Sequence, residues 1–233
     1  MSLNMSKTLF EKLSDKGFFP AQVAEVGVYH PETSNIYQYI LNGVNCILVE
    51  PDPESIGLIK SNFSGFGNIV LHEVAVSDFN GQIELVQRNA STFISTLNNT
   101  PAIINDNYTI TDNDKIVVES RTFEKIDDGT IDLLSADIEG SEWYVIKYMI
   151  SRPAVISLET HGAIYINPFI DQILNWMKNN NYEIWYKTSS DTVFVKKNSI
   201  IVSAWDKFKL INVNFYLFLK RQRKRLKKKL LHS

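Results

Sequence analysis

The sequence predicts an α/β fold built on a doubly wound, mostly parallel sheet that finishes in an antiparallel hairpin. Apolar runs of strand length alternate with segments of helical period between residues 23 and 185, as in sheets covered by helices. Gly, Pro, Asn or Asp stands near each switch between the two patterns and marks a turn. Two adjacent strand-like runs, 182–187 and 192–197, predict the closing hairpin.

The composition indicates a globular protein with one main domain. The chain has 233 residues, of which 44% are hydrophobic and 21% charged, and it shows neither a collagen period nor a solenoid repeat. Cys46 is the only cysteine, so no disulfide can form within the chain. Residues 1–19 lack the apolar segment of a secretory signal. We therefore expect a reducing, cytoplasmic location.

Charge divides the chain into an acidic body and a basic tail. Residues 206–233 contain ten Lys or Arg and one acid, a net charge of +9, which leaves 14 basic and 25 acidic residues, or −11, in residues 1–205. An acidic body argues against a nucleic-acid-binding domain, because phosphates require a basic face. We expect an N-terminal helical segment at 1–21, the main domain at 22–198 and a basic amphipathic tail at 199–233.

The first part of the main domain predicts a β-α-β unit. Residues 22–28 form a short β-rich run, and residues 33–41 carry apolar side chains on one helical face before Asn42 and Gly43 end the helix. A second strand is expected at 45–50. The proline that follows at position 53 is suited to open the next helix.

The middle of the chain predicts two strands and a long connection. Residues 69–76 have the pattern of a third strand, and the alternating run 81–88 that of an added strand. Residues 89–114 are polar and rich in Asn and Thr. We expect a long loop there that acts as a lid or an acceptor-binding segment, because long structureless connections in compact domains tend to be functional.

The rest of the domain repeats the alternation. The expected elements are a strand at 115–123, a buried strand at 130–138, a helix at 143–150, a strand at 154–161 and a helix at 169–179. Parallel strands bring their carboxyl ends to one edge of the sheet, which is where doubly wound sheets bind ligands.

Gly27 follows the first strand at this edge, where a glycine lets the backbone approach a ligand. The glycine pattern of a pyrophosphate-binding site would need glycines at positions 29 and 32, which hold Tyr29 and Glu32. Their presence disfavours a nicotinamide-dependent oxidoreductase. A glycine in an ordinary strand-to-helix turn is the alternative for Gly27.

Acidic residues also follow the second and third strands. Glu50 stands 23 positions after Gly27 (50 minus 27), about where a carboxylate accepts hydrogen bonds from ribose hydroxyls, and Pro51 stiffens the turn. A solvated acid at a strand end is the alternative. Ser77 and Asp78 end the third strand, where Asp78 either accepts from a purine amine or simply forms the turn.

Two further pairs of polar residues end the next two strands. Asp137 and Glu139 close a buried strand, where a carboxylate is costly without a partner. Glu139 could instead cap the following helix. Glu159 and His161 have the same spacing, and a histidine can take up a proton near neutral pH. These oxygen-rich residues also permit a divalent metal site, which the spacing does not demand and which we do not favour.

Together these segments resemble the FkbM-type family of S-adenosylmethionine-dependent methyltransferases over residues 22–197. The matching segments are EVG at 25–27, VEPDPE at 49–54, AVSDFNG at 75–81, LLSADIEGSEW at 133–143 and ISLETH at 156–161. The resemblance implies a Rossmann-like sheet of seven strands whose last strand is antiparallel. Pro31 is a departure, because it stands where the family's first motif has a second glycine.

The resemblance also implies S-adenosylmethionine as cofactor and a role for each matching residue. Acidic side chains suit the positive charge of this cofactor. The implied contacts are Glu25 with the methionine ammonium, Gly27 with the cofactor through its backbone, Glu50 with the ribose, Asp78 with the adenine amine, and Asp137 with the pocket floor near the methyl group. Pro51 and Ser77 are implied to bind the cofactor as well.

The acceptors implied by the resemblance are hydroxyls of saccharides or natural products, and a lipid-linked glycan would suit the tail. A base must remove the hydroxyl proton, and His161 is the first candidate and Glu139 the second. A function of another class is a non-catalytic cofactor-binding or scaffold protein, which Pro31 in the glycine position favours.

The tail lies outside the resemblance. Its apolar stretch, 210–219, is shorter than the roughly 20 residues that span a bilayer, and a dense Lys/Arg block follows it. We expect residues 207–231 to lie on an anionic membrane, at the periphery of its inner face. Docking on the domain or on a dimer partner is the alternative, and nucleic acid is a minor one. The sequence carries no signal for an oligomeric state.

Overall fold

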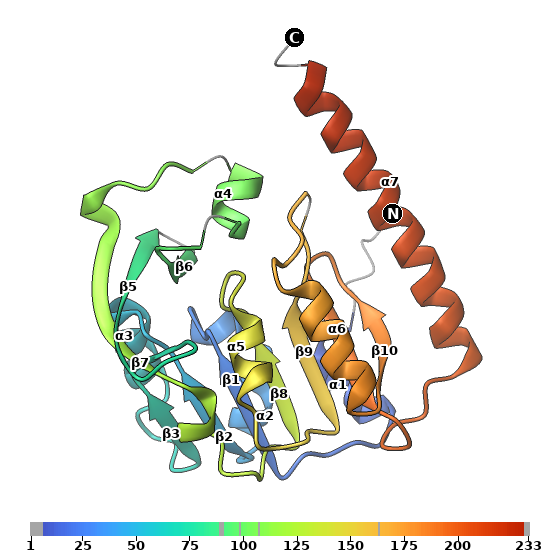
Figure 1. The fold of residues 1–233 in the computed structure, drawn as a ribbon. Coiled ribbons are helices and arrows are strands. Elements are labelled where there is room, and N and C mark those ends of the chain that lie inside the picture. Colours follow the sequence, from blue (N-terminus) through green and yellow to red (C-terminus); the bar gives the residue numbers. More distant parts are fainter. Residues whose placement is uncertain (1–6, 89–90, 98, 107, 163, 231–233) are drawn as a thin grey trace.

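The fold is organised around one seven-stranded sheet (Figure 1). The computed structural model describes residues 7–88, 91–97, 99–106, 108–162 and 164–230. In spatial order the strands of the sheet are β10 (Tyr182–Lys187), β11 (Asp191–Lys196), β9 (Val155–Glu159), β8 (Leu133–Ala136), β1 (Gln22–Val26), β2 (Asn45–Val49) and β3 (Ile69–His72).

The sheet is mixed, and this refines the sequence prediction. Strands β9, β8, β1, β2 and β3 are mutually parallel, whereas β11 is antiparallel to both of its neighbours. The last strand of the chain is therefore antiparallel, as expected. It lies inside the sheet, with β10 at the edge, so two of the neighbouring pairs are antiparallel rather than one.

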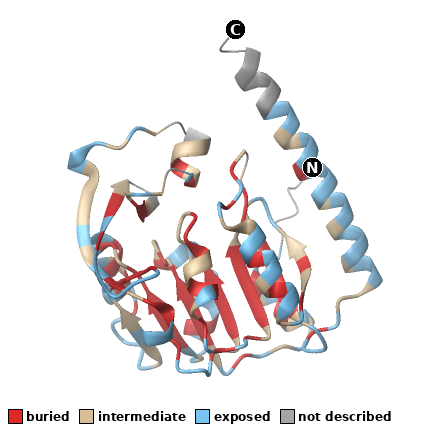
Figure 2. Ribbon diagram, in the orientation of Figure 1, coloured by how far each residue is buried: buried red, intermediate tan, exposed pale blue. Residues whose placement is uncertain are grey.

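Alternate side chains of the parallel strands feed two hydrophobic cores, one on each face of the sheet. Val26, Leu134 and Ile156 point into one core, and Val23 and Leu133 point into the other. Because both faces are covered, the strands are apolar at almost every position, and Figure 2 shows them buried between helices with exposed outer sides.

Short helices cover the two faces. Helices α5 (Glu142–Lys147) and α6 (Ile170–Asn179) pack on the first core, and α1 (Leu9–Asp15), α2 (Tyr37–Leu41) and α3 (Pro53–Asn62) pack on the second. A 3-10 turn, η1 (Pro31–Thr33), precedes α2, and another, η3 (Phe123–Lys125), precedes β8.

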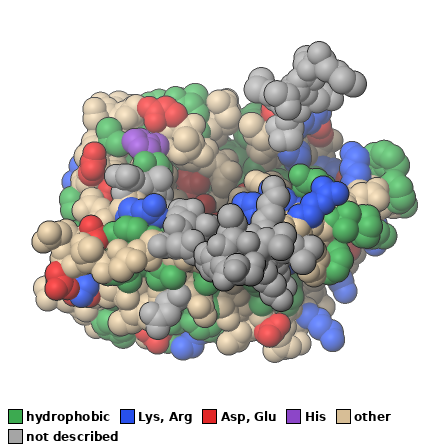
Figure 3. Space-filling model, turned by 90° about the horizontal axis from the view of Figure 1, so that it is seen from above, with side chains coloured by type: hydrophobic (Ala, Val, Ile, Leu, Met, Phe, Trp, Pro, Cys, Tyr) green, Lys and Arg blue, Asp and Glu red, His purple; other side chains and the backbone are tan. Residues whose placement is uncertain are grey.

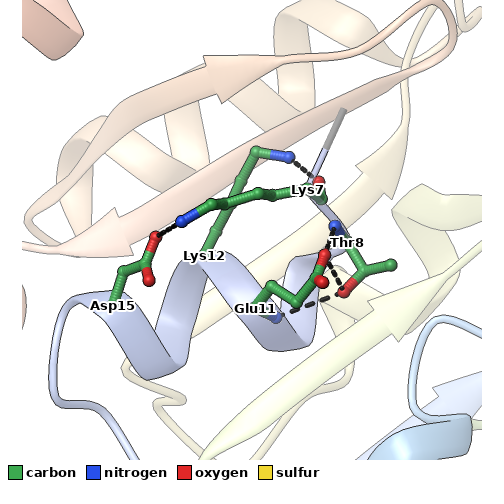
Figure 4. A network of polar contacts seen from close by, with 5 residues as sticks. All are labelled: Lys7, Thr8, Glu11, Lys12 and Asp15. Carbon is green, nitrogen blue, oxygen red and sulfur yellow. Dashed lines mark hydrogen bonds and ion pairs between the residues drawn. The ribbon is translucent and has the colours of Figure 1, made fainter. Parts of the chain in front are cut away.

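The N-terminal segment contributes α1, whose start is fixed by a capping box (Figure 4). The Thr8 hydroxyl accepts from the Glu11 amide at 3.2 Å, while the Glu11 carboxylate accepts from the Thr8 amide at 2.7 Å. An ion pair between Lys7 and Asp15 spans the helix. Leu9 and Leu13 then bury this helix against the second core.

A second sheet of four strands is inserted after β3. Its strands, in spatial order, are β4 (Ala75–Val76), β7 (Lys115–Arg121), β5 (Gly81–Arg88) and β6 (Ser91–Ile94). The single strand expected at 69–76 is therefore wrong, because its two ends belong to different sheets. The loop expected at 89–114 is also wrong over much of its length, since it contains β6, α4 (Pro101–Asp106) and the 3-10 turn η2 (Asp112–Asp114).

A long C-terminal helix, α7 (Ala204–Leu230), runs beside β10 and ends away from the rest of the molecule (Figure 1). The Ser203 hydroxyl caps its start by accepting from the Asp206 amide at 3.1 Å, and Lys16 pairs with Asp206 at 2.8 Å. Within the part of the chain that the structure describes, no helix has the length and apolarity needed to cross a bilayer.

Candidate functional site

A cavity of about 280 Å³ opens at the carboxyl ends of β1, β2 and β8. Seen from that side, acidic side chains lie in a hollow of the surface (Figure 3). The cavity is lined by the turn after β1, the start of α3, the segment Val74–Val76, strand β6 and the turn after β8. Its polar lining residues are Glu25, Tyr29, Thr33, Ser34, Asn35, Glu50, Ser55, Thr92, Asp137, Glu139 and Ser141.

Gly27 brings the backbone of β1 against the backbone of the turn after β8. Its φ of +82° belongs to the left-handed region that favours glycine. A Cβ at this position would stand 1.9 Å from the carbonyl oxygen of Asp137. The glycine at this place in the sequence is therefore required by conformation and by contact, so it is not interchangeable with the residues of an ordinary turn.

Glu25 is buried below this turn and is held by the residues that precede α2. Its carboxylate accepts from the Asn35 amide at 2.9 Å and from the Ser34 hydroxyl. Burial raises the pKa of Glu25 to about 7, against the opposing effect of the Ser34 and Asn35 hydrogen bonds. Each oxygen keeps one lone pair for a ligand, since a carboxylate can accept about four hydrogen bonds.

Glu50 supports the same turn from β2. One carboxylate oxygen accepts from the amides of Val28 and Tyr29 at 2.8 and 2.9 Å, and the other accepts from the Asp52 amide at 3.0 Å. Burial raises the pKa of Glu50, and these backbone donors oppose the shift. One lone pair is left, so Glu50 as it stands has room for one ligand hydroxyl rather than two.

The turn after β8 is fixed by Glu142, which sequence reasoning placed only within the family motif. Its carboxylate accepts from the amides of Ile138 and Gly140 at 2.8 and 3.2 Å and from the side chain of Asn167. These bonds hold Glu139 in the left-handed region, at φ +56°, and both Asp137 and Glu139 line the cavity.

An acidic cluster extends from the cavity floor toward β9. Carboxylate oxygens of Asp137, Glu142 and Glu159 lie within 4.8 Å of one another. Burial raises the pKa of Glu142 and of Glu159, and the neighbouring carboxylates raise both further. The donor set suits a hard divalent ion, but Glu142 already accepts three hydrogen bonds, and we assign no metal.

His161 does not line the cavity. Its Nε2 lies 3.2 Å from the carbonyl oxygen of Thr188, which can only accept, so Nε2 carries the proton. Its Nδ1 lies 2.9 Å from the Thr160 hydroxyl. Burial lowers the pKa of His161 to about 4. The geometry therefore gives His161 the surroundings of a neutral, structural histidine, whereas Glu139 faces the cavity.

Ser77 and Asp78 do not line the cavity either. The Ser77 hydroxyl lies 2.6 Å from that of Ser120 in β7, inside the second sheet. Asp78 is exposed beyond the end of β4. The purine contact expected for these residues stays a prediction, and the segment Val74–Val76 lines the cavity in their place. Pro51 does line it, and its expected contact with the cofactor stays a prediction.

Sequence reasoning missed the residues that orient the acids. Ser34 and Asn35 hold Glu25, and the only signal was a polar pair following the first strand. Thr92 and Phe93 reach the cavity from β6, which the Asn- and Thr-rich composition of 89–114 concealed.

The acidic lining of the cavity is suited to a cationic ligand. Among its described lining residues four are acidic, namely Glu25, Glu50, Asp137 and Glu139, and none is Lys, Arg or His. A cation beside Glu25 would offset the burial that raises its pKa. The residues present therefore fit S-adenosylmethionine, which carries a sulfonium and an ammonium group.

Comparison with solved structures finds weak similarity to methyltransferases. One is a ribosomal protein L11 methylase from Lactobacillus delbrueckii subsp. bulgaricus (12% identity, 80% of this chain, 75% of that chain, TM-score 0.42). Another is M. capricolum TrmK in complex with S-adenosyl-homocysteine (11%, 83%, 71%, 0.40). A third is an S-adenosylmethionine-dependent methyltransferase from Methanosarcina mazei (7%, 82%, 99%, 0.43). No curated protein matches.

The family model for the methyltransferase FkbM domain matches residues 24–184, which is more than half of the chain and includes the end of β1, the residues that line the cavity and the acidic turn after β8. The chain belongs to the FkbM family of methyltransferases, whose cofactor is S-adenosylmethionine.

Proposed function

We propose that this methyltransferase transfers the methyl group of S-adenosylmethionine to a hydroxyl of a saccharide. The observation that carries the proposal is the acid-lined cavity at the carboxyl edge of the sheet, where Gly27 meets Asp137 and no basic side chain is among the described lining residues. Threonine, serine and asparagine side chains stand around the acids, and such neutral donors and acceptors suit sugar hydroxyls.

Each acid of the cavity has a role in the proposal. Glu25, with a free lone pair on each oxygen, accepts from the methionine ammonium of the cofactor, and Glu50 accepts from one ribose hydroxyl. Asp137 forms the floor, where its backbone lies against Gly27. A cation next to a buried carboxylate favours its charged form and so offsets the effect of burial on its pKa.

Glu139 is the proposed base. The bound cofactor supplies an activated methyl group on a sulfonium. With the cofactor bound, the Glu139 carboxylate would take the proton of the acceptor hydroxyl, so that the acceptor oxygen can receive the methyl group. The chain must also align the acceptor oxygen, methyl and sulfur, for which the left-handed turn held by Glu142 is suited.

Pro31 is the observation that favours a second candidate function, that of a non-catalytic cofactor-binding or scaffold protein. It is buried and opens the 3-10 turn that positions Ser34 and Asn35 against Glu25. If this turn blocks the ammonium site, the protein would bind the cofactor incompletely and act as a non-catalytic binding or scaffold protein. The same experiment separates the two functions.

The test combines a binding and a transfer measurement. Calorimetric titration with S-adenosylhomocysteine on the wild type and on Glu50→Ala should show micromolar binding that the variant loses. Isotopically labelled S-adenosylmethionine is then offered with oligosaccharides and nucleotide sugars, and label should appear as an alkali-stable methyl ether. Binding without transfer to any saccharide would leave the scaffold function, and no binding to the wild type would overturn both.

A further inference from the structure

Helix α7 packs on the domain through one of its faces. Leu210 and Val213 are half-buried and Leu217 is 6% exposed, and their spacing of three and four residues places them on one side of a helix. The helix runs beside β10, and Lys207 reaches Glu183 of that strand at 3.7 Å. This contact accounts for one apolar stripe of the helix only.

The opposite side of α7 is also apolar, and it is exposed. At about 3.6 residues per turn, the centre of this outer apolar face lies across the helix axis from Leu217, and Trp205 and Phe218 lie toward its edges. Its residues are Trp205, Phe208, Ile211, Phe215, Phe218 and Leu219, with exposed fractions of 61, 52, 65, 63, 53 and 38%. A helix that is apolar on opposite sides needs a second apolar surrounding. Figure 1 shows the helix at the margin of the molecule.

The basic residues of α7 indicate what kind of partner covers the outer apolar face. From residue 207 to residue 230 the helix carries ten Lys or Arg and no acid. Two of these residues, Arg223 and Lys224, are exposed where the outer apolar face ends. Figure 3 shows apolar and basic side chains together at this margin of the molecule. Aromatic residues beside a cationic segment are typical of helices that lie in the interface of an anionic bilayer.

We propose that α7 binds the surface of an anionic lipid bilayer, with its outer apolar face among the acyl chains and its basic C-terminal half on the headgroups. The helix is 27 residues long, or about 40 Å at about 1.5 Å per residue, which suits a helix lying in the membrane plane. The proposal does not depend on the identity of the methyl acceptor.

A second copy of the chain and a nucleic acid fit the surface less well. Two parallel copies would bring two segments of like charge together, which is unfavourable. A nucleic acid would contact the basic residues but leave the exposed aromatic residues uncovered. A bilayer with anionic headgroups can cover the outer apolar face with acyl chains and contact the basic residues with headgroups at the same time.

The test is co-sedimentation of the full chain with vesicles of phosphatidylcholine alone and of phosphatidylcholine with about a third phosphatidylglycerol, at physiological salt. Binding is expected to the second only. The double variant Phe215→Ser/Phe218→Ser should weaken it roughly tenfold or more, because two exposed rings no longer enter the acyl region. Arg223→Gln/Lys224→Gln should weaken it roughly 20-fold, at about fivefold per charge.

Matched variants keep the test specific. Phe19→Ser/Val117→Ser removes two apolar side chains that are 76 and 65% exposed elsewhere, and Lys178→Gln/Lys197→Gln removes two exposed charges of the domain. Both should bind vesicles as the wild type does. Unchanged circular dichroism and unchanged S-adenosylhomocysteine affinity in every variant show that folding is intact.

Three outcomes would overturn the proposal. The first is no binding to the anionic vesicles. The second is binding that the charge variant loses but the Phe215→Ser/Phe218→Ser variant keeps, since the outer apolar face would then not enter the membrane. The third is a dimer in sedimentation equilibrium that the phenylalanine variant dissociates while vesicle binding stays absent, which would assign the face to a second copy of the chain.

Discussion

The carbonyl oxygen of Asp137 occupies the space that a Cβ of residue 27 would need. The distance from that ideal Cβ position to the oxygen is 1.9 Å, and the contacted atom is backbone, which cannot rotate away. The amide of Asp137 also donates to the carbonyl of Val26 at 2.9 Å, so β1 and β8 are locked together at this point. The cavity floor therefore depends on the absence of one side-chain carbon.

We expect Gly27→Ala to lower the free energy of unfolding by more than about 2 kcal/mol and to remove S-adenosylhomocysteine binding. Left-handed backbone alone costs an alanine about 1–2 kcal/mol, and the collision with Asp137 adds to that cost. Gly17→Ala is the matched control, because Gly17 has φ +70° and nothing within 4 Å of its Cβ position. Equal losses in the two variants, by chemical denaturation, would show that the contact is unimportant.

Cofactor affinity should rise as the pH rises through about 7. Burial raises the pKa of Glu25 to about 7, and a cation is bound best by the ionised carboxylate. Calorimetry of S-adenosylmethionine binding between pH 6 and pH 8 should therefore detect proton release as a heat that depends on the buffer. Glu25→Gln should weaken binding and flatten this pH dependence. A steep pH dependence that survives in the variant would place the titrating group elsewhere.

The same shift predicts how Glu25 affects the stability of the ligand-free protein. An acid whose folded pKa lies above its unfolded value of 4.5 binds more protons in the folded state between those two values. The contribution of Glu25 is thus most favourable below pH 4.5 and is lost as the pH rises through about 7, by about 3 kcal/mol at most. Urea unfolding of Glu25→Gln against wild type should show the variant gaining relative stability over this range.

Substitution should separate the two candidate bases. Glu139→Gln is expected to lower kcat by about 10²–10⁴ with little change in S-adenosylhomocysteine affinity, because it removes the proton acceptor and keeps the shape of the side chain. His161→Asn should affect stability more than kcat, since both ring nitrogens have partners inside the protein. A large fall in kcat for His161→Asn with normal thermal stability would reverse the assignment.

Glu142 should prove to be a positioning residue. Glu142→Ala leaves the buried amide of Gly140 and the half-buried amide of Ile138 without their acceptor, and a buried donor without a partner costs about 1–3 kcal/mol. The exposed acid Glu54, in the first turn of α3, provides the control, and Glu54→Ala should change stability by less than about 1 kcal/mol. Equal losses of thermal stability in the two variants would contradict this role.

The sequence by itself located most strands of the seven-stranded sheet and the carboxylates near their ends. Short apolar runs bounded by turn residues are typical of buried strands, and they predicted β1, β2, β8 and β9 within a few residues. Glu25 is the last residue but one of β1, Glu50 and Asp137 directly follow β2 and β8, and the ends of parallel strands meet at one edge. These predictions depend on local pattern alone.

The tertiary structure decided the second sheet and the partners of each functional group. Strand β6 pairs with β5, and its Phe93 packs with Val86 and Ala102 in a small core that the polar composition of residues 89–114 does not indicate. The pairs Gly27 with Asp137 and His161 with Thr188 likewise join residues far apart in sequence. Whether a strand-end residue enters the cavity depends on backbone direction after the strand. Glu139 and Glu142 are both glutamates in one turn. The packing of this turn makes Glu139 line the cavity and makes Glu142 accept hydrogen bonds from the turn's backbone.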